Sequence, residues 1–185
     1  NRFAIKRTKN GDTGMLQNQV LLPEISDAQI EKVGGKGKEF WVFGTNYPND
    51  ALPNRPDDAN EKGAWRVEVS PKAAATENYF LNVMQVADNT CKQMNDVKRI
   101  DAEKVVGVQI ADRIVTFSKN SQPLSGKVDV KVDGNTTMKF VITDLIPGTW
   151  QIKKDGKVYI PAMEVRSDDG ILAFEGAAGH YEFLR

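Results

Sequence analysis

The hydrophobic and polar residues of this chain alternate in short runs that are typical of β-strands. Residues 65–69 place a tryptophan and two valines on one face and charged side chains on the other, and residues 2–7 carry Phe3 and Ile5 on the same parity. Runs of this kind, spaced about 8–12 residues apart, predict a sandwich or barrel of roughly a dozen strands. We therefore expect an all-β fold, an antiparallel β-sandwich with one long loop.

Turn residues separate these runs, most regularly in the C-terminal third. Pro147-Gly148 and Asp155-Gly156 supply the fixed or positive φ angles that tight reversals require, and Asp133-Gly134-Asn135 predicts a hairpin in the same way. Residues 24–33 fit a short helix or an irregular strand equally well, and the polar residues 87–104 could contain a short helix. The predicted strands cover residues 2–7, 15–22, 39–43, 65–69, 79–86, 105–110, 114–117, 127–132, 138–143, 150–153, 158–165, 171–174 and 181–184.

Two features of these strands predict which residues form the core. Residues 79–86 are apolar on both parities, as in a central strand that is covered on both faces. Trp65 is in phase with Val67, and Trp150 is in phase with Ile152. We therefore expect both tryptophans to fill core volume.

Composition excludes several classes of function. The 185 residues show no convincing domain linker, so residues 1–185 are expected to form one β-sandwich domain. Lys+Arg and Asp+Glu are both 25, which leaves no overall field to bind nucleic acid or an anionic membrane, and no apolar run is long enough to cross a membrane. Because the chain opens at Asn1 with neither methionine nor a signal-like stretch, we expect it to be a trimmed chain or a piece of a longer protein.

The inventory of reactive residues is small. His180 is the only histidine and Cys91 the only cysteine, which excludes multi-histidine zinc sites and an internal disulfide. Neighbours on a strand point to opposite faces, so Tyr181 is expected in the core and His180 outside it. A calcium site using Asp57, Asp58 and Asn60 is the one metal alternative, although the segment departs from the EF-hand pattern. We predict no catalytic residue, no bound metal and no cofactor.

Residues 44–63 form the longest stretch without a predicted strand. Loops of about 20 residues are uncommon in compact domains and tend to be either functional or disordered. The glycine-rich residues just before this loop carry Lys36 and Lys38, and Trp41 and Tyr47 lie near its start. Ammonium groups beside aromatic rings suit an acidic sugar, so we predict these four residues as glycan-binding. The alternative is that the loop only packs against another domain.

Five segments, read in order, resemble a known family. They are residues 21–23 (Leu-Leu-Pro), 33–42 (Val-Gly-Gly-Lys-Gly-Lys-Glu-Phe-Trp-Val), 44–47 (Gly-Thr-Asn-Tyr), 65–71 (Trp-Arg-Val-Glu-Val-Ser-Pro) and 79–86 (Tyr-Phe-Leu-Asn-Val-Met-Gln-Val). Together they resemble the C-terminal β-domain of heparinase II/III-like polysaccharide lyases. The resemblance implies a bacterial, periplasmic or secreted parent in which an N-terminal α/α toroid precedes β-domains. It also implies cleavage of uronic-acid glycans, including glycosaminoglycans, by β-elimination.

The same resemblance implies where catalysis takes place. In the family the catalytic groups come from the toroid and from a histidine of the following β-domain, whereas His180 lies at the far C-terminus. We therefore expect a non-catalytic module that supports the toroid and contacts acidic polysaccharide. Three alternatives remain: an independent carbohydrate-binding module, a part of the active-site cleft in the full-length lyase, and an autonomous enzyme with Tyr47 or His180 as base.

Overall fold

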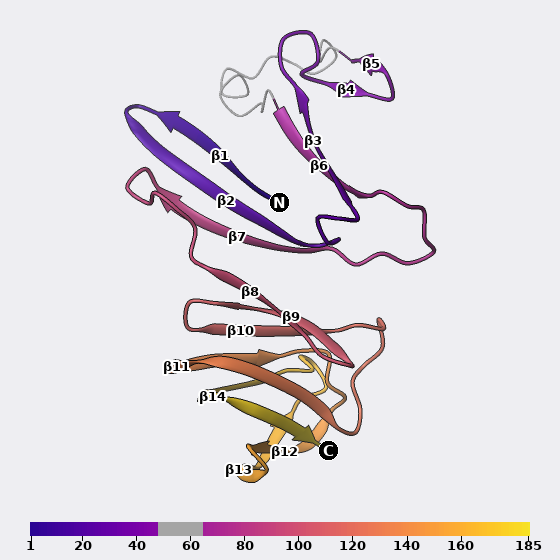
Figure 1. The fold of residues 1–185 in the computed structure, drawn as a ribbon, viewed down its shortest axis with the longest axis vertical. Helices are drawn as coiled ribbons and strands as arrows, with labels where there is room; N and C mark the ends of the chain where they lie inside the picture. Colours follow the sequence, from indigo (N-terminus) through magenta and orange to yellow (C-terminus); the bar gives the residue numbers. More distant parts are fainter. Residues whose placement is uncertain (48–64) are drawn as a thin grey trace. The chain divides into compact units, whose positions relative to one another are not determined.

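The computed structural model describes residues 1–47 and 65–185, and within them every regular element is a β-strand (Figure 1). The expected all-β fold class is therefore confirmed. The strands are β1 (Arg2–Lys9), β2 (Asp12–Leu22), β3 (Ala28–Gly34), β4 (Trp41–Val42), β5 (Thr45–Asn46), β6 (Trp65–Pro71), β7 (Leu81–Asp88), β8 (Val97–Asp101), β9 (Val105–Ile110), β10 (Arg113–Ser118), β11 (Val128–Ile142), β12 (Gly148–Lys154), β13 (Lys157–Val165) and β14 (Leu172–Leu184).

The described strands form four sheets and two compact units. The sheets have the orders β1-β2-β7, β3-β6, β4-β5 and β13-β12-β14-β11-β10-β9-β8. The first unit contains residues 1–6 and 16–84, and the second contains residues 7–15 and 85–185. The whole seven-stranded sheet belongs to the second unit.

In the first unit, the ambiguous residues 24–33 contribute to strand β3. It pairs antiparallel with β6, from Ala28 opposite Pro71 to Gly34 opposite Trp65. Because β3 and β6 form a sheet of only two strands, the alternation in β6 does not produce a buried face. Trp65 is 53% exposed, so the expectation that it lies in the core is wrong.

Strand β7 also differs from the prediction. It lies at the end of the order β1-β2-β7 and therefore has one neighbour instead of two. Leu81 and Val83 are buried, but Met84 and Val86 are 65% and 83% exposed. The prediction of a strand covered on both faces is wrong, since apolar residues on both parities do not by themselves provide a second covering layer.

The second unit is built around two long strands that bend. Strand β11 was predicted as a hairpin, but both of its halves pair with β14: Val128–Val132 with its C-terminal half, and Thr137–Ile142 with its N-terminal half. The register shifts between Val132 and Thr137, where four residues of β11 lie opposite a single residue of β14. Such a bulge bends a sheet, and the Asp-Gly-Asn signal marks this corner.

Ring contacts show that the bend folds the sheet onto itself. Tyr181 is opposite Val130 and Phe174 is opposite Phe140, and the two pairs are ten residues apart along β11. A straight strand would separate them by about 33 Å. Instead, the ring centroids of Phe140 and Tyr181 are 4.6 Å apart. The two halves of β11 and β14 therefore lie in facing layers, and the core lies between these layers.

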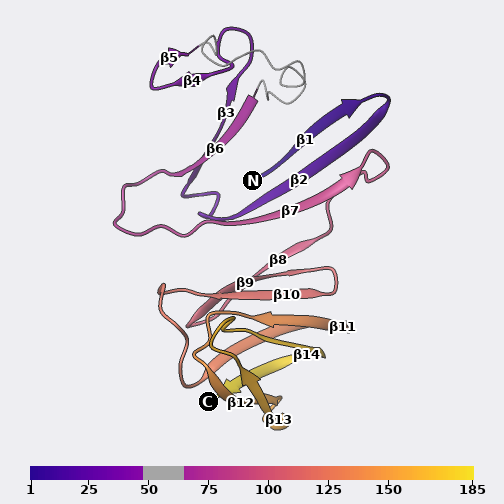
Figure 2. The ribbon, with the colours of Figure 1, turned by 180° about the vertical axis from the view of Figure 1, so that it is seen from behind.

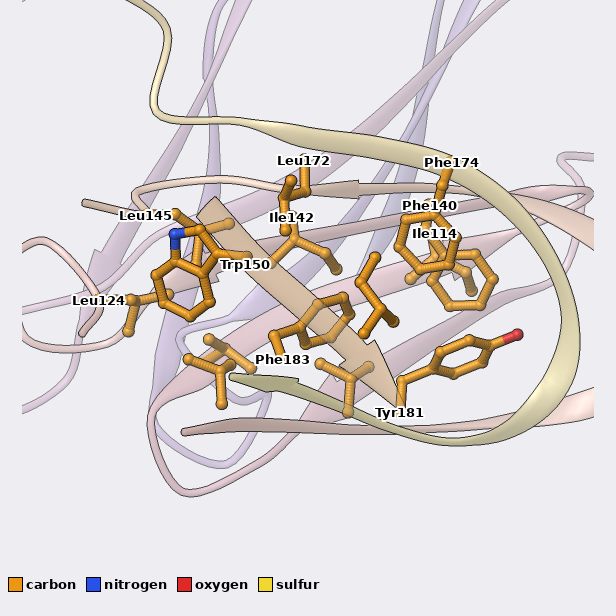
Figure 3. Packing of buried hydrophobic residues seen from close by; sticks show 14 of the residues in the cluster. Ile114, Leu124, Phe140, Ile142, Leu145, Trp150, Leu172, Phe174, Tyr181 and Phe183 are labelled. Carbon is orange, nitrogen blue, oxygen red and sulfur yellow. The ribbon is translucent and has the colours of Figure 1, made fainter. Parts of the chain in front are cut away.

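The core of the second unit is continuous and rich in aromatic residues (Figure 3). Phe140 stacks on Phe174 at 4.7 Å, and Phe183 contacts Phe174 at 6.0 Å. Trp150 is fully buried and donates its indole N–H to the carbonyl of Ile146 at 3.0 Å. The expectations that Trp150 and Tyr181 lie in the core are confirmed.

Strands β8, β9 and β10 complete the second unit and lie side by side in both views (Figures 1 and 2). The expected hairpin of β9 and β10 is confirmed, while β8 lies within residues 87–104, where a short helix was the alternative. Strand β10 pairs with β11 in parallel, an exception to the antiparallel expectation. The side-chain amide of Gln109 on β9 donates to the backbone carbonyl of Asp133 at 3.0 Å, and this bond joins β9 to the corner of β11.

Candidate functional site

A groove in the first unit brings together most of the predicted glycan-binding residues. One of its walls is the β4-β5 hairpin, whose two turn residues, Phe43 and Gly44, have φ angles of 47° and 82°. Positive φ at both central positions is typical of a type I′ turn, whose twist matches the flanking strands. The backbone N–H of Phe40 donates to the side-chain oxygen of Asn46 at 2.8 Å, which closes the base of the hairpin.

The groove has a volume of about 1060 Å³ and is lined by residues of β3, β6 and the β4-β5 hairpin. Lys38, Trp41 and Tyr47 line it, as does Phe43 at the hairpin tip. Tyr47 is 57% exposed, and its backbone N–H donates to the carbonyl of Phe40 at 3.2 Å. The groove is therefore an open surface with an accessible phenol ring.

Two lysines on the groove lie over tryptophan rings. The ammonium group of Lys38 is 5.0 Å from the ring centroid of Trp41, and that of Lys32 is 3.9 Å from the ring of Trp65. Such cation–π contacts position an ammonium group without neutralising its charge. Because Lys38 lies over the indole of Trp41, Tyr47 is the more accessible of the two predicted aromatic platforms.

The remaining charged groups of the groove limit its positive character. Arg66 pairs with Glu68 at 2.6 Å and also donates to the carbonyl of Trp41, so its guanidinium is committed to the protein. Glu31 and Glu39 also line the groove. Carboxylates can accept hydrogen bonds from sugar hydroxyls, whereas Lys32 and Lys38 are the cations positioned for an anionic ligand.

The structure brings together three of the four predicted glycan-binding residues. Lys38, Trp41 and Tyr47 lie together on the groove, whereas Lys36 is exposed and is not among its lining residues. Sequence reasoning missed Lys32 and Arg66, which come from β3 and β6. Pairing of β3 with β6 places Arg66 opposite Val33, next to Lys32, and nothing in either strand alone indicates this pairing.

A second charged cluster lies in the second unit, around the only histidine. The ring Nε2 of His180 is 3.0 Å from Asp129, and Lys127 pairs with both Asp129, at 3.1 Å, and Glu182. The bond from Lys127 lowers the pKa of Glu182, and the bond to Glu182 raises the pKa of Lys127. The His180 side chain is 47% exposed, which confirms the expectation that it points outward.

No group of three or more potential metal ligands occurs among residues 1–47 and 65–185. The calcium alternative at Asp57, Asp58 and Asn60 lies outside the described residues. In the described part of the chain, no helix is long and apolar enough to cross a membrane.

Fold and site together define an all-β module with an open groove that carries aromatic rings and lysines. Residues 99–185 match the family described as the heparinase II C-terminal domain. The expected resemblance to the C-terminal β-domain of heparinase II/III-like polysaccharide lyases is thereby confirmed for residues 99–185, which are similar to the heparinase II C-terminal domain. No curated protein matches the chain.

The matched residues differ from those on which the resemblance was based. The five resembling segments lie between residues 21 and 86, in the first unit, whereas the match begins at Arg99, within β8. It covers the rest of the seven-stranded sheet with its folded corner. The predicted glycan-binding residues therefore lie outside the matched residues.

Proposed function

We propose that this chain is a non-catalytic β-module of a heparinase II/III-like lyase and that its first unit contacts acidic glycan. The match of residues 99–185 to the heparinase II C-terminal domain supports the proposal that the chain belongs to a larger, polysaccharide-acting parent. In this proposal the parent is bacterial and periplasmic or secreted, and the module supports an N-terminal α/α toroid.

The observation that carries the glycan contact is the groove itself, which places Lys38 and Tyr47 on one surface. A pyranose ring stacks on an aromatic face, and an ammonium group attracts its carboxylate or sulfate. The carboxylates of Glu31 and Glu39 oppose this attraction, so the isolated module should bind in the millimolar range, about 4 kcal/mol.

We propose that the module is non-catalytic because of what β-elimination requires. The reaction needs a group that neutralises the uronate, a base for the proton and an acid for the leaving oxygen. The two candidate bases, Tyr47 and His180, belong to different compact units. His180 is committed to Asp129, and Tyr181, its neighbour, is buried.

A titration of the 185-residue chain with a uronate oligosaccharide tests the glycan contact. Lys38→Ala and Tyr47→Ala should each weaken binding, with the lysine effect fading at high salt because exposed charges are screened. Lys36→Ala is the matched control, since it removes a neighbouring lysine that does not line the groove. Wild-type chain that shows no binding at millimolar oligosaccharide would refute the contact and leave only the supporting role.

The same samples test the non-catalytic assignment. Incubation with heparan, alginate or chondroitin should produce no unsaturated uronate, which is detected by its ultraviolet absorbance. Turnover that His180→Ala or Tyr47→Phe abolishes would instead establish an autonomous lyase.

A further inference from the structure

The free edge of β1 lies along a second, apolar groove of the first unit. In the order β1-β2-β7, β1 has one neighbour, and the backbone N–H of Val20 donates to the carbonyl of Asn1 at 2.9 Å. In an antiparallel pair, hydrogen-bonded positions alternate along the strand. Phe3 and Ile5 therefore direct their backbone groups toward β2, and Ala4 directs its own toward the free edge.

The groove follows this edge. It has a volume of about 470 Å³ and is lined by all of residues 1–6. Successive side chains point to opposite faces of a strand, so a groove that is lined by six consecutive residues runs along the edge of the strand and not over one face. Outside β1 it is lined by apolar side chains, with Ile25, Ile30 and Val67 among them, and by the charged residues Glu31, Lys32 and Arg66.

The shape of this groove favours an extended chain over a small molecule. Ile5, Ile25 and Trp65 remain 53%, 58% and 53% exposed, so a small ligand would not be enclosed. Pockets for small ligands bury most of the ligand surface. A polypeptide strand, in contrast, uses the free backbone groups of an edge and places alternate side chains in the groove.

The charges on the groove specify the partner. Arg2, Lys6 and Lys32 line it, and none of them forms an ion pair within the described part of the chain. Arg2 donates to the neutral amide of Gln19 at 2.9 Å, and Lys32 lies over Trp65. Glu31 is the only carboxylate among the lining residues.

We propose that the free edge of β1 binds an extended polypeptide strand in which apolar and acidic residues alternate. The apolar side chains fill the groove beside Ile25 and Ile30, and the carboxylates pair with Lys6 and Lys32. A second copy of β1 is a poor occupant, because strand pairing would place basic residues opposite basic residues. The two grooves share Glu31, Lys32 and Arg66, but strand binding at the edge of β1 does not depend on the proposed glycan contact.

The experiment uses a capped ten-residue peptide that alternates valine and glutamate, titrated into the ¹⁵N-labelled 185-residue chain. Hydrogen exchange at the amides of Ala4 and Lys6 should slow, while the amides of Phe3 and Ile5, which already face β2, should be unchanged. Lys6→Glu with Lys32→Glu should weaken binding at least about fivefold, corresponding to about 1 kcal/mol. A peptide that alternates valine and lysine should not bind.

Two substitutions at one position provide the matched control. Ala4→Pro removes an N–H on the free edge and should abolish binding, since proline is tolerated on the open side of an edge strand. Ala4→Val keeps the N–H and should retain binding. Equal binding by the Ala4→Pro chain, no binding by the wild-type chain, or equal binding of the lysine peptide would each overturn the proposal. Dimerisation of the chain that Ala4→Pro abolishes would also overturn it, in favour of a second copy.

Discussion

The contact between Phe140 and Tyr181 provides a direct test of the folded sheet in the second unit. The two rings come from opposite halves of β11 and β14 and lie 4.6 Å apart. An aromatic pair of this kind contributes about 0.5–1.5 kcal/mol beyond its area burial. We therefore expect Phe140→Leu and Tyr181→Leu to be coupled in a double-mutant cycle by about 0.5–1.5 kcal/mol.

The expected coupling energy depends on the bend in β11 and β14. If β11 and β14 were straight, the two positions would lie about 33 Å apart, and residues so far apart are additive within about 0.3–0.5 kcal/mol. Each single substitution keeps an apolar side chain at its position, so the unit should remain folded. Val158, 54% exposed on β13 at the end of the sheet, provides the control: Phe140→Leu with Val158→Ala should be additive.

The assay is urea unfolding that is followed by the fluorescence of Trp150. Trp41→Phe and Trp65→Phe in the background leave Trp150 as the only tryptophan of the chain, and it lies in the second unit. Free energies of unfolding are compared only among variants with equal denaturant slopes. A coupling energy below about 0.3 kcal/mol would show that the two halves of the strands do not face each other.

Three further predictions concern the same core and the half-exposed Trp65. Trp150→Ala should lower the free energy of unfolding by about 3–5 kcal/mol, and Trp65→Ala by about half as much. Equal shifts in the urea midpoint of the two variants would contradict this order. Burial raises the pKa of Tyr181 to about 12, compared with 10.0 in the unfolded state. The stabilisation that this shift provides is fully present below pH 10.0 and should be lost as the pH rises toward 12. Urea titrations at alkaline pH should show that Tyr181→Phe removes this pH-dependent component. A Cβ at Gly176 would lie 2.3 Å from the Tyr181 hydroxyl, so Gly176→Ala should lower the free energy of unfolding by about 1–3 kcal/mol. A smaller loss in the Tyr181→Phe background would identify this clash as the cause.

Local pattern predicted the strands of this chain far better than their partners. Short apolar runs correctly placed β1, β6, β9 and β10, because each of these strands follows from its own side chains. The Asp-Gly-Asn sequence at residues 133–135 was interpreted as a hairpin, although it lies at the corner of β11. A turn and a bulged corner need the same backbone freedom, here a φ of 147° at Gly134, and only the pairing of both halves with β14 distinguishes them.

Burial was harder to predict than strand formation. Trp65 and Trp150 have similar contexts in the sequence, yet one is half exposed and the other is fully buried. The difference comes from whether a second layer covers the strand, and this depends on residues far away in the sequence. For the same reason, the groove could be predicted from Lys38, Trp41 and Tyr47, which are close in sequence, but the contribution of Lys32 required the pairing of β3 with β6.

The shared strands of the second unit also determine how it unfolds. Because β11 and β14 each contribute to both layers, we expect the opening of one layer to destabilise the other. Elements that are linked in this way form one cooperative unit, and amides in such strands exchange only through its global opening. The residues that match the heparinase II C-terminal domain, from Arg99 onward, contain both strands in full. We therefore expect the matched residues to unfold cooperatively, because they include both of the strands that link the two layers.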